Sequence, residues 1–320
     1  MITLLWRTDA HLADVPPESR MDNWTQTILG KVRQIGDLAR DLKADAVLDG
    51  GDFFHNKSPS RNSHELVRQA ASAHAGYPCP VWATIGNHDV KYGSAEFLSE
   101  SPLGVLYETG VFHRLYAPHE AVFERGGVKV RVVGIPYHGA HYDTNLLTTI
   151  VRGDEDWLVA VAHCLASPQG GTLFESEDVL KYSDLANLAP DAWCFGHWHK
   201  DQGVQRIGSK VFINTGSMSR GALRQDELKR VPSCVSLHFD KRLEVQIHPL
   251  QVQAAEDVFD LDNRARVESR ENSMDALVDS IKATLTQRRE GSLLEDIRGL
   301  SGVPDIVRER SCHYVEKAGG

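Results

Sequence analysis

The stretch from Ala44 to His55, ADAVLDGGDFFH, joins a short apolar run to a cluster of polar residues. The run predicts a buried β-strand, because it is short, apolar and followed at once by glycine and acidic residues. The Gly51-Asp52 pair then places a carboxylate at the carboxyl end of that strand. Such a unit is typical of α/β proteins, in which loops after the strands carry the chemical groups.

The same unit recurs along the chain. It appears as Ile2–Trp6 before Asp9 and His11, Val81–Ile85 before Asn87 and Asp89, Trp157–Ala162 before His163, and Ala192–Phe195 before His197 and His199. Because loops that follow parallel strands converge on one crevice, we expect the polar residues of all five units to meet at one edge of a sheet. The donors gathered there would be Asp9, His11, Asp52, Asn87, His163, His197 and His199.

The segments between and after these units predict the remaining organisation. Apolar residues near a 3.6-residue period indicate helices over 24–42 and 63–75, and Gly126-Gly127 predicts a hairpin turn before a strand over 128–135. Residues 235–247 alternate between apolar and polar, which predicts one edge or half-exposed strand. These features predict an α/β domain over 1–250, in which two packed sheets could form the core, and a mainly helical segment over 251–320 that caps the domain or binds a second subunit or partner.

Two helices are expected in that C-terminal segment. Asn272 or Ser273 would cap the first, and Ser292 the second. The first would bury the apolar stripe Met274, Leu277, Val278, Ile281 and Leu285, and the second the stripe Leu293, Leu294, Ile297 and Leu300. These stripes either pack on the α/β domain or dock a partner.

The composition excludes several classes of protein. In 320 residues, 41% are hydrophobic and 25% are charged, which is ordinary for a globular chain and unlike a disordered one. No apolar run approaches the roughly 18 residues of a membrane helix, and the N-terminus does not resemble an export signal. The five cysteines form no CxxC pair, which argues against a disulfide framework and a thiolate zinc site and predicts a reducing cytoplasm.

The donor set predicts a metal centre. Carboxylate, amide and imidazole ligands without thiolate suit Mn, Fe, Zn or Co. Seven donors are too many for one tetrahedral ion, but they suit two ions that share a carboxylate, and the Gly51-Asp52 turn could supply it. Two ions about 3.5–4 Å apart are the usual arrangement for phosphoester hydrolysis. Each motif alone is weak, and the prediction depends on the ordered set.

In this order, the five motifs resemble the signature of calcineurin-like metallophosphoesterases, over roughly residues 1 to 220. The resemblance implies an α/β fold, a four-layer α/β/β/α sandwich with a small C-terminal appendage. It also implies that one ion is held by Asp9, His11, Asp52 and His199. The second ion would be held by Asp52, Asn87, His163 and His197, with Asp52 bridging.

The run from Gly50 to Arg61 resembles the nuclease branch of this superfamily, which includes SbcD-type DNA repair exonuclease subunits and their phage recombination counterparts. Asn214 to Ser217, followed by Arg220, resembles a turn near the end of nuclease domains in that branch. The branch implies a DNA exonuclease and endonuclease with two Mn²⁺ ions, or Mg²⁺, Fe²⁺ or Zn²⁺ in their place. It also implies a homodimer with an SMC-like ATPase of the SbcC type, in the cytoplasm of a bacterium or of a phage-infected host.

Three residues outside the ligand set are expected to act in catalysis. His88 would stabilise the leaving oxygen or donate a proton to it, and Asp89 would hydrogen-bond His88 and set its tautomer. His55 would contact the phosphate backbone. The cationic side chains expected to contact DNA phosphates are Arg61, Lys200 and Arg220.

Two other functions remain open on sequence grounds: a phosphodiesterase or phosphatase on nucleotides or other small phosphoesters, and a non-catalytic scaffold. The net charge of -9 argues against a nucleic-acid partner. However, seven basic and three acidic residues lie between Trp198 and Arg230, which predicts a positive field beside the His197/His199 pair.

Overall fold

The computed structural model describes residues 1–17, 19–91, 95–142, 144–173, 177–223, 225–261 and 293–318. It divides into two units, Met1–Asp260 and Leu261–Gly320, and each unit is treated separately below. The domain boundary at residue 250 stays a prediction.

The described residues of the first unit form two six-stranded sheets and one small sheet. The first large sheet has the order β15 (Leu243–Pro249), β14 (Ser233–Phe239), β1 (Ile2–Arg7), β2 (Ala46–Asp49), β3 (Val81–Ala83) and β4 (His113–Arg114). The second has the order β12 (Gly203–Ile207), β13 (Lys210–Asn214), β11 (Ala192–Gly196), β7 (Trp157–His163), β6 (Val128–Ile135) and β5 (Ala121–Arg125). The small sheet joins β8 (Ala166–Ser167), β10 (Glu177–Lys181) and β9 (Gly171–Leu173).

The helices of the first unit are short apart from the first two. They are α1 (Trp24–Asp41), α2 (His64–His74), α3 (Pro102–Glu108), α4 (Thr144–Thr148), α5 (Tyr182–Leu185), α6 (Gln225–Lys229) and α7 (Ala255–Val258), with 3-10 turns η1 (Pro59–Arg61) and η3 (Ala95–Glu100). The side chains of Asn23 and Ser63 accept the backbone N–H groups of Gln26 and Leu66, which caps α1 and α2 at their N-termini. Both long helices begin and end within a residue of the predicted positions.

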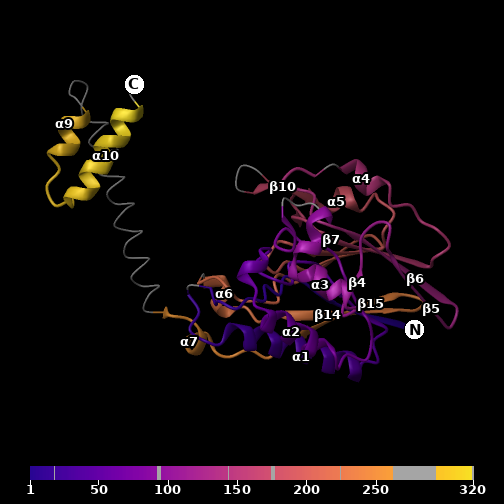
Figure 1. Cartoon of the computed structure of the whole chain (residues 1–320). Coiled ribbons are helices and arrows are strands. Elements are labelled where there is room, and N and C mark those ends of the chain that lie inside the picture. Colours follow the sequence, from indigo (N-terminus) through magenta and orange to yellow (C-terminus); the bar gives the residue numbers. More distant parts are fainter. Residues whose placement is uncertain are drawn as a thin grey trace. The chain divides into compact units, whose positions relative to one another are not determined.

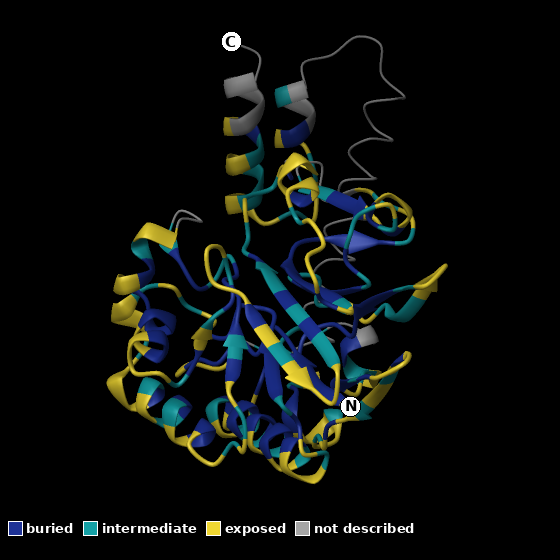
Figure 2. Cartoon of the chain, turned by 90° about the vertical axis from the view of Figure 1, so that its right-hand side faces the viewer, coloured by how far each residue is buried: buried dark blue, intermediate teal, exposed yellow. Residues whose placement is uncertain are grey.

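Three apolar cores separate four layers. Leu5 and Val47 point from the first sheet toward α1, α2 and α3, whereas Leu4 and Leu48 point to the second sheet, because successive side chains of a strand alternate between faces. The far face of the second sheet packs Trp193 against α4 and α5. Figure 1 shows α1 and α2 along the first sheet, and Figure 2 shows buried strands in the interior, with exposed residues on edge strands and on the outer faces of the helices. This is the expected four-layer α/β/β/α sandwich.

The structure corrects two details of the predicted sheets. Residues 235–247 form no single strand: they span the hairpin of β14 and β15, in which β14 is buried and only β15 is an edge strand. The five strand-then-polar units also do not share one sheet, because β1, β2 and β3 belong to the first large sheet, and β7 and β11 to the second. The predicted hairpin turn is confirmed, with Gly126 and Gly127 at φ 60° and 75° between β5 and β6.

The second unit contains α9 (Leu293–Arg298) and α10 (Asp305–Ala318). The predicted helix over residues 293–300 is thus confirmed for most of its length. The predicted stripe from Met274 to Leu285 and the caps at Asn272, Ser273 and Ser292 lie outside the described residues. Within the described part of the chain, no helix combines the length and the apolar character needed to cross a bilayer.

Candidate metal centre

The loops that follow β1, β2 and β11 bend sharply where the predicted ligands lie. Asp9, His11, Asp52 and His197 adopt the left-handed conformation, with φ of 53°, 48°, 52° and 82°. Residues other than glycine adopt this conformation at a cost, and such strain is concentrated at functional sites. The bends turn the side chains of both sheets toward one region between the ends of the sheets.

Glycines allow these loops to touch. A Cβ on Gly86 would lie 2.0 Å from Asp52 Oδ1, and a Cβ on Gly51 would lie 2.6 Å from the Gly86 nitrogen. Backbone hydrogen bonds then lock the loops together: the N–H of Asp9 donates to the carbonyl of Gly51 at 3.1 Å, and that of His11 to the carbonyl of Asp52 at 3.0 Å. Gly51 and Gly86 are therefore needed for the close approach of the two loop backbones.

The first donor set comprises Asp9, His11, Asp52 and His199, and one ligand atom of each lies within 4.8 Å of those of the others. Asp9 Oδ1 lies 3.8 Å from His11 Nε2 and 3.6 Å from His199 Nε2. The two imidazole nitrogens are themselves 2.9 Å apart. Four donors thus converge on one point, as a cation site requires.

The second donor set comprises Asp52, His163 and His197, again within 4.8 Å of one another. Nε2 of His163 lies 3.4 Å from Asp52 Oδ2 and 3.1 Å from the side-chain oxygen of Asn87. All seven predicted ligands are therefore brought together, and Asp52 belongs to both sets. Their ligand roles stay predictions, but the oxygen and imidazole donors fit two divalent ions that share a carboxylate.

The electrostatics of the two sets favour charged carboxylates. Burial raises the pKa of Asp9, but His199 and His163 outweigh it and bring the pKa to about 2. Burial lowers the pKa of His163, whereas Asp52, Asp9 and the carbonyl of Gly50 raise it to about 9. Since a bound ion must displace the proton of His163, we expect metal binding to be weaker at acid pH.

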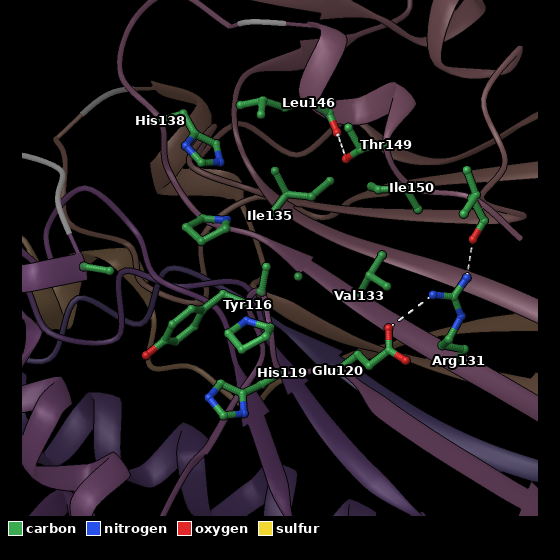
Figure 3. A pocket seen from close by; sticks show the side chains of 16 residues that line it. Tyr116, His119, Glu120, Arg131, Val133, Ile135, His138, Leu146, Thr149 and Ile150 are labelled. Atoms are coloured by element: carbon green, nitrogen blue, oxygen red, sulfur yellow. Dashed lines mark hydrogen bonds and ion pairs between the residues drawn. The ribbon is translucent and has the colours of Figure 1, made fainter. Parts of the chain in front are cut away.

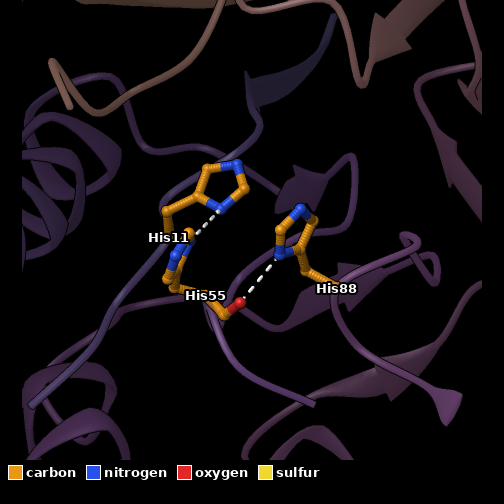
Figure 4. Close-up of side chains that lie close together, drawn as sticks. All are labelled: His11, His55 and His88. Atoms are coloured by element: carbon orange, nitrogen blue, oxygen red, sulfur yellow. Dashed lines mark hydrogen bonds between the residues drawn. The ribbon is translucent and has the colours of Figure 1, made fainter. Parts of the chain in front are cut away.

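His11, His55 and His88 form a third cluster beside the first donor set (Figure 4). The Nδ1 atoms of His11 and His55 lie 3.3 Å apart, and the rings of His55 and His88 stack with centroids 5.2 Å apart. Together with His199 they line a cavity of about 210 Å³, whose other wall includes Trp24. The two predicted catalytic histidines thus face an open space next to the first ion's position.

The hydrogen bond expected between Asp89 and His88 is not formed. Asp89 points into its own turn and accepts the backbone N–H groups of Asp52 and Gly86 at 2.7 and 2.9 Å. His88 instead places Nδ1 2.7 Å from the carbonyl of His55. Burial and the nearby Asp52 charge raise the pKa of Asp89 well above its usual value. Asp89 therefore shapes the loop that carries Asp52, and the His55 carbonyl orients His88.

The three predicted DNA-contacting cations lie in different surroundings. Arg61 and Lys200 are exposed, but Arg220 is 4% exposed and donates to the carbonyl of Gln253 at 2.7 Å. The positive field expected from the sequence is also weakened in space. Lys210, for example, begins β13 at the end away from the site and donates to the carbonyl of Pro190 at 2.8 Å.

A larger cavity of about 600 Å³ lies against β6 (Figure 3). Tyr116, His138 and Ile150 line it, and the Arg131 guanidinium on its wall is paired with Glu120 and Glu155. Because this arginine is already neutralised by two carboxylates, the cavity offers a phosphate little attraction through it.

Comparison with known proteins agrees with this geometry. The family model described as calcineurin-like phosphoesterase matches residues 8–201, which contain all the donors of both sets. The chain belongs to this family. No curated protein is similar enough in sequence to serve as a relative.

Among solved structures, this phosphoesterase is similar to a dimetal phosphatase from Danio rerio, with 11% identity, a TM-score of 0.51 and coverage of 78% of this chain and 96% of that one. An archaeal phosphodiesterase is 15% identical, with a TM-score of 0.40 and coverage of 78% and 100%. The Haemophilus influenzae NAD nucleotidase is 12% identical, with a TM-score of 0.45, and the chain covers 49% of it. At these identities the likeness concerns the fold alone.

Two contributors to the phosphoesterase site were not found from the sequence. The centroid of the Tyr137 ring lies 5.2 Å from that of the His197 ring. The sequence could have indicated Tyr137, because β6 is followed by Tyr137 and His138 and so repeats the pattern of a strand before polar residues. Glu177 Oε1 lies 2.7 Å from His197 Nε2, and no motif surrounds it in the sequence.

A buried ion pair lies directly beneath the two loops. Arg7 Nε donates to Asp49 Oδ2 at 2.7 Å, and Asp49 Oδ1 accepts the N–H of Gly51 at 3.1 Å. Both side chains are almost fully buried, and the N–H groups of Arg7 also contact Tyr77 and His74. The pair thus links the ends of β1 and β2, from which Asp9 and Asp52 follow.

We expect Asp49→Ala to lower the free energy of unfolding by about 3–5 kcal/mol, because Arg7 would remain buried without its counter-ion. Urea denaturation followed by circular dichroism measures this change. The double variant Arg7→Met/Asp49→Leu should lose less, since it leaves no buried charge. Equal stability of Asp49→Ala and the unmodified protein would refute the role of the pair.

Proposed function

We propose that the protein is a metal-dependent DNA nuclease of the SbcD type, with Mn²⁺ as the native ion. The observation that carries the proposal is the position of His55 and His88 at a cavity next to the first donor set. His55 belongs to the run from Gly50 to Arg61, whose resemblance to the nuclease branch supports a DNA substrate. The proposal includes a homodimer and an SMC-like ATPase partner, in a cytoplasmic setting.

The chain's own residues would perform distinct tasks in this reaction. Two divalent ions, when bound, supply the positive charge that polarises a phosphate and activates water. Asp52 belongs to both donor sets and would hold both ions, and the backbone bonds between the loops fix the spacing of the two sets. The side chains of Arg61 and Lys200 are exposed and would contact flanking phosphates.

A phosphodiesterase acting on small phosphoesters is the competing candidate. The cavity beside the first donor set measures about 210 Å³, which is small, and the chain carries a net charge of -9. Both facts favour a small substrate over a polyanion. With DNA as the substrate, they imply weak and salt-sensitive binding by this chain, so a partner would supply further contacts.

Digestion of end-labelled linear duplex DNA with Mn²⁺ distinguishes the two candidates. We expect a ladder of labelled products whose formation stops when the metal is chelated. Bis-p-nitrophenyl phosphate and cyclic nucleotides are assayed in parallel, with Asp52→Asn as the control for contaminating nucleases. Turnover of the small substrates alone, with intact DNA, would replace the nuclease proposal by the competing one.

A further inference from the structure

The ring of His197 is held from several sides. Its backbone N–H donates to both carboxylate oxygens of Asp9, at 3.2 and 3.1 Å, and its own φ is 82°. The rings of Tyr137 and His163 pack against it, with centroids 5.2 and 5.0 Å away. Its Nε2 lies 2.7 Å from Oε1 of Glu177, and the two side chains are only 13% and 19% exposed.

This contact decides which ring nitrogen is left for an ion. A carboxylate accepts a hydrogen bond, so Nε2 of His197 must carry the proton and Nδ1 is the nitrogen with a free lone pair. His163 shows the complementary case in the same donor set: its Nδ1 lies 2.7 Å from the carbonyl of Gly50, which leaves Nε2 for the centre. In each imidazole of the second set, one nitrogen thus donates a hydrogen bond to an oxygen, and the other nitrogen is left for an ion.

Glu177 reaches His197 because of the small sheet. β10, which begins at Glu177, pairs with β9 through Leu173 and with β8 through Leu180 and Lys181. The N–H of the next residue, Asp178, donates to the carbonyl of Ala140 at 2.8 Å. The carboxylate is therefore presented by a paired strand, inserted between β7 and β11 along the chain.

We propose that Glu177 is a positioning residue that holds His197 with Nδ1 toward the second ion and thereby strengthens the binding of that ion. Histidines that ligate metals usually donate their other N–H to such an acceptor, and loss of the acceptor typically weakens metal binding 10- to 100-fold. The inference rests on the dinuclear centre of the family and does not depend on DNA being the substrate.

Metal titration of Glu177→Ala and Glu177→Gln tests this role. We expect the first Mn²⁺ to bind as in the unmodified protein and the second about 10- to 100-fold more weakly in Glu177→Ala. Glu177→Gln keeps an oxygen acceptor without the charge and should fall between the two. The measurements are calorimetry, metal content after dialysis, and electron paramagnetic resonance, which separates isolated from spin-coupled Mn²⁺ ions. Asp178→Asn, on the same strand, is the matched control.

Two results would overturn the inference. One is unchanged affinity for both ions in Glu177→Ala, and the other is an equal loss of both ions together with a lower melting temperature, which would indicate a merely structural role. Metal binding is read without any nucleic acid. Glu177→Ala could therefore bind the second ion more weakly while the unmodified protein fails to cleave DNA. That pair of results would support the role of Glu177 and reject only the proposed nuclease function.

Discussion

Asp52→Asn is expected to abolish hydrolysis and to lower the affinity for divalent ions by more than about 100-fold. A hundredfold loss is the upper end of what is typical when a residue that only hydrogen-bonds a metal ligand is removed. Asp52 Oδ2 lies 3.4 Å from Nε2 of His163 and 3.9 Å from Nε2 of His11, so the same oxygen faces one histidine from each donor set. Burial raises the pKa of Asp52, but His163 and His11 outweigh it and hold the pKa far below the usual range. The carboxylate is thus charged at every working pH.

Asparagine is the sharpest substitution at this position. Asp52 has a φ of 52°, and asparagine tolerates the left-handed conformation better than alanine does. Its side-chain oxygen can still accept the N–H of His88, which Asp52 Oδ1 accepts at 2.7 Å. Metal content after dialysis and hydrolysis of bis-p-nitrophenyl phosphate measure the effect, with Asp37→Asn on the surface of α1 as the control. Two tightly bound ions in Asp52→Asn would refute the shared-ligand role.

His88→Ala is expected to reduce the turnover number by about 10²- to 10⁴-fold while both ions remain bound, as for loss of a general acid. Nδ1 of His88 lies 2.7 Å from the carbonyl of His55, which fixes the proton there and leaves Nε2 as the nitrogen that can exchange a proton. The ring also lines the cavity beside the first donor set. A proton held at Nε2 can therefore reach the leaving oxygen of a phosphoester in that cavity.

The control for His88→Ala is His64→Ala, which removes an exposed histidine from α2. Turnover is measured with substrates whose leaving groups differ in basicity. A good leaving group needs less help from an acid, so the loss should shrink for p-nitrophenol esters relative to alkyl esters. Loss of bound metal in His88→Ala would show instead that the residue supports the centre, and unchanged turnover would exclude it from catalysis.

Most of the fold could be predicted from the sequence because strands and helices are marked by the length and apolar pattern of short runs of residues. The run 44–48 and its four counterparts were recognisable as strands from length and apolar content, and β2, β7 and β11 lie where those runs predicted. Residues 235–247 failed as one strand because their alternation spans two short strands of a hairpin, and the turn between them carries no glycine.

The sequence by itself identified the candidate donors of the centre, since the chemistry of Asp52, His163 and His199 is fixed by residue type and each lies at or just after the end of a strand. Only the tertiary structure decided how two sheets bring these donors together, that Glu177 contacts His197, and that the His55 carbonyl replaces Asp89 as the partner of His88. It also buried Arg220, which the sequence predicted to contact DNA phosphates. The reason is physical: residue type and periodicity set local conformation, whereas side-chain partners and burial depend on how distant segments pack.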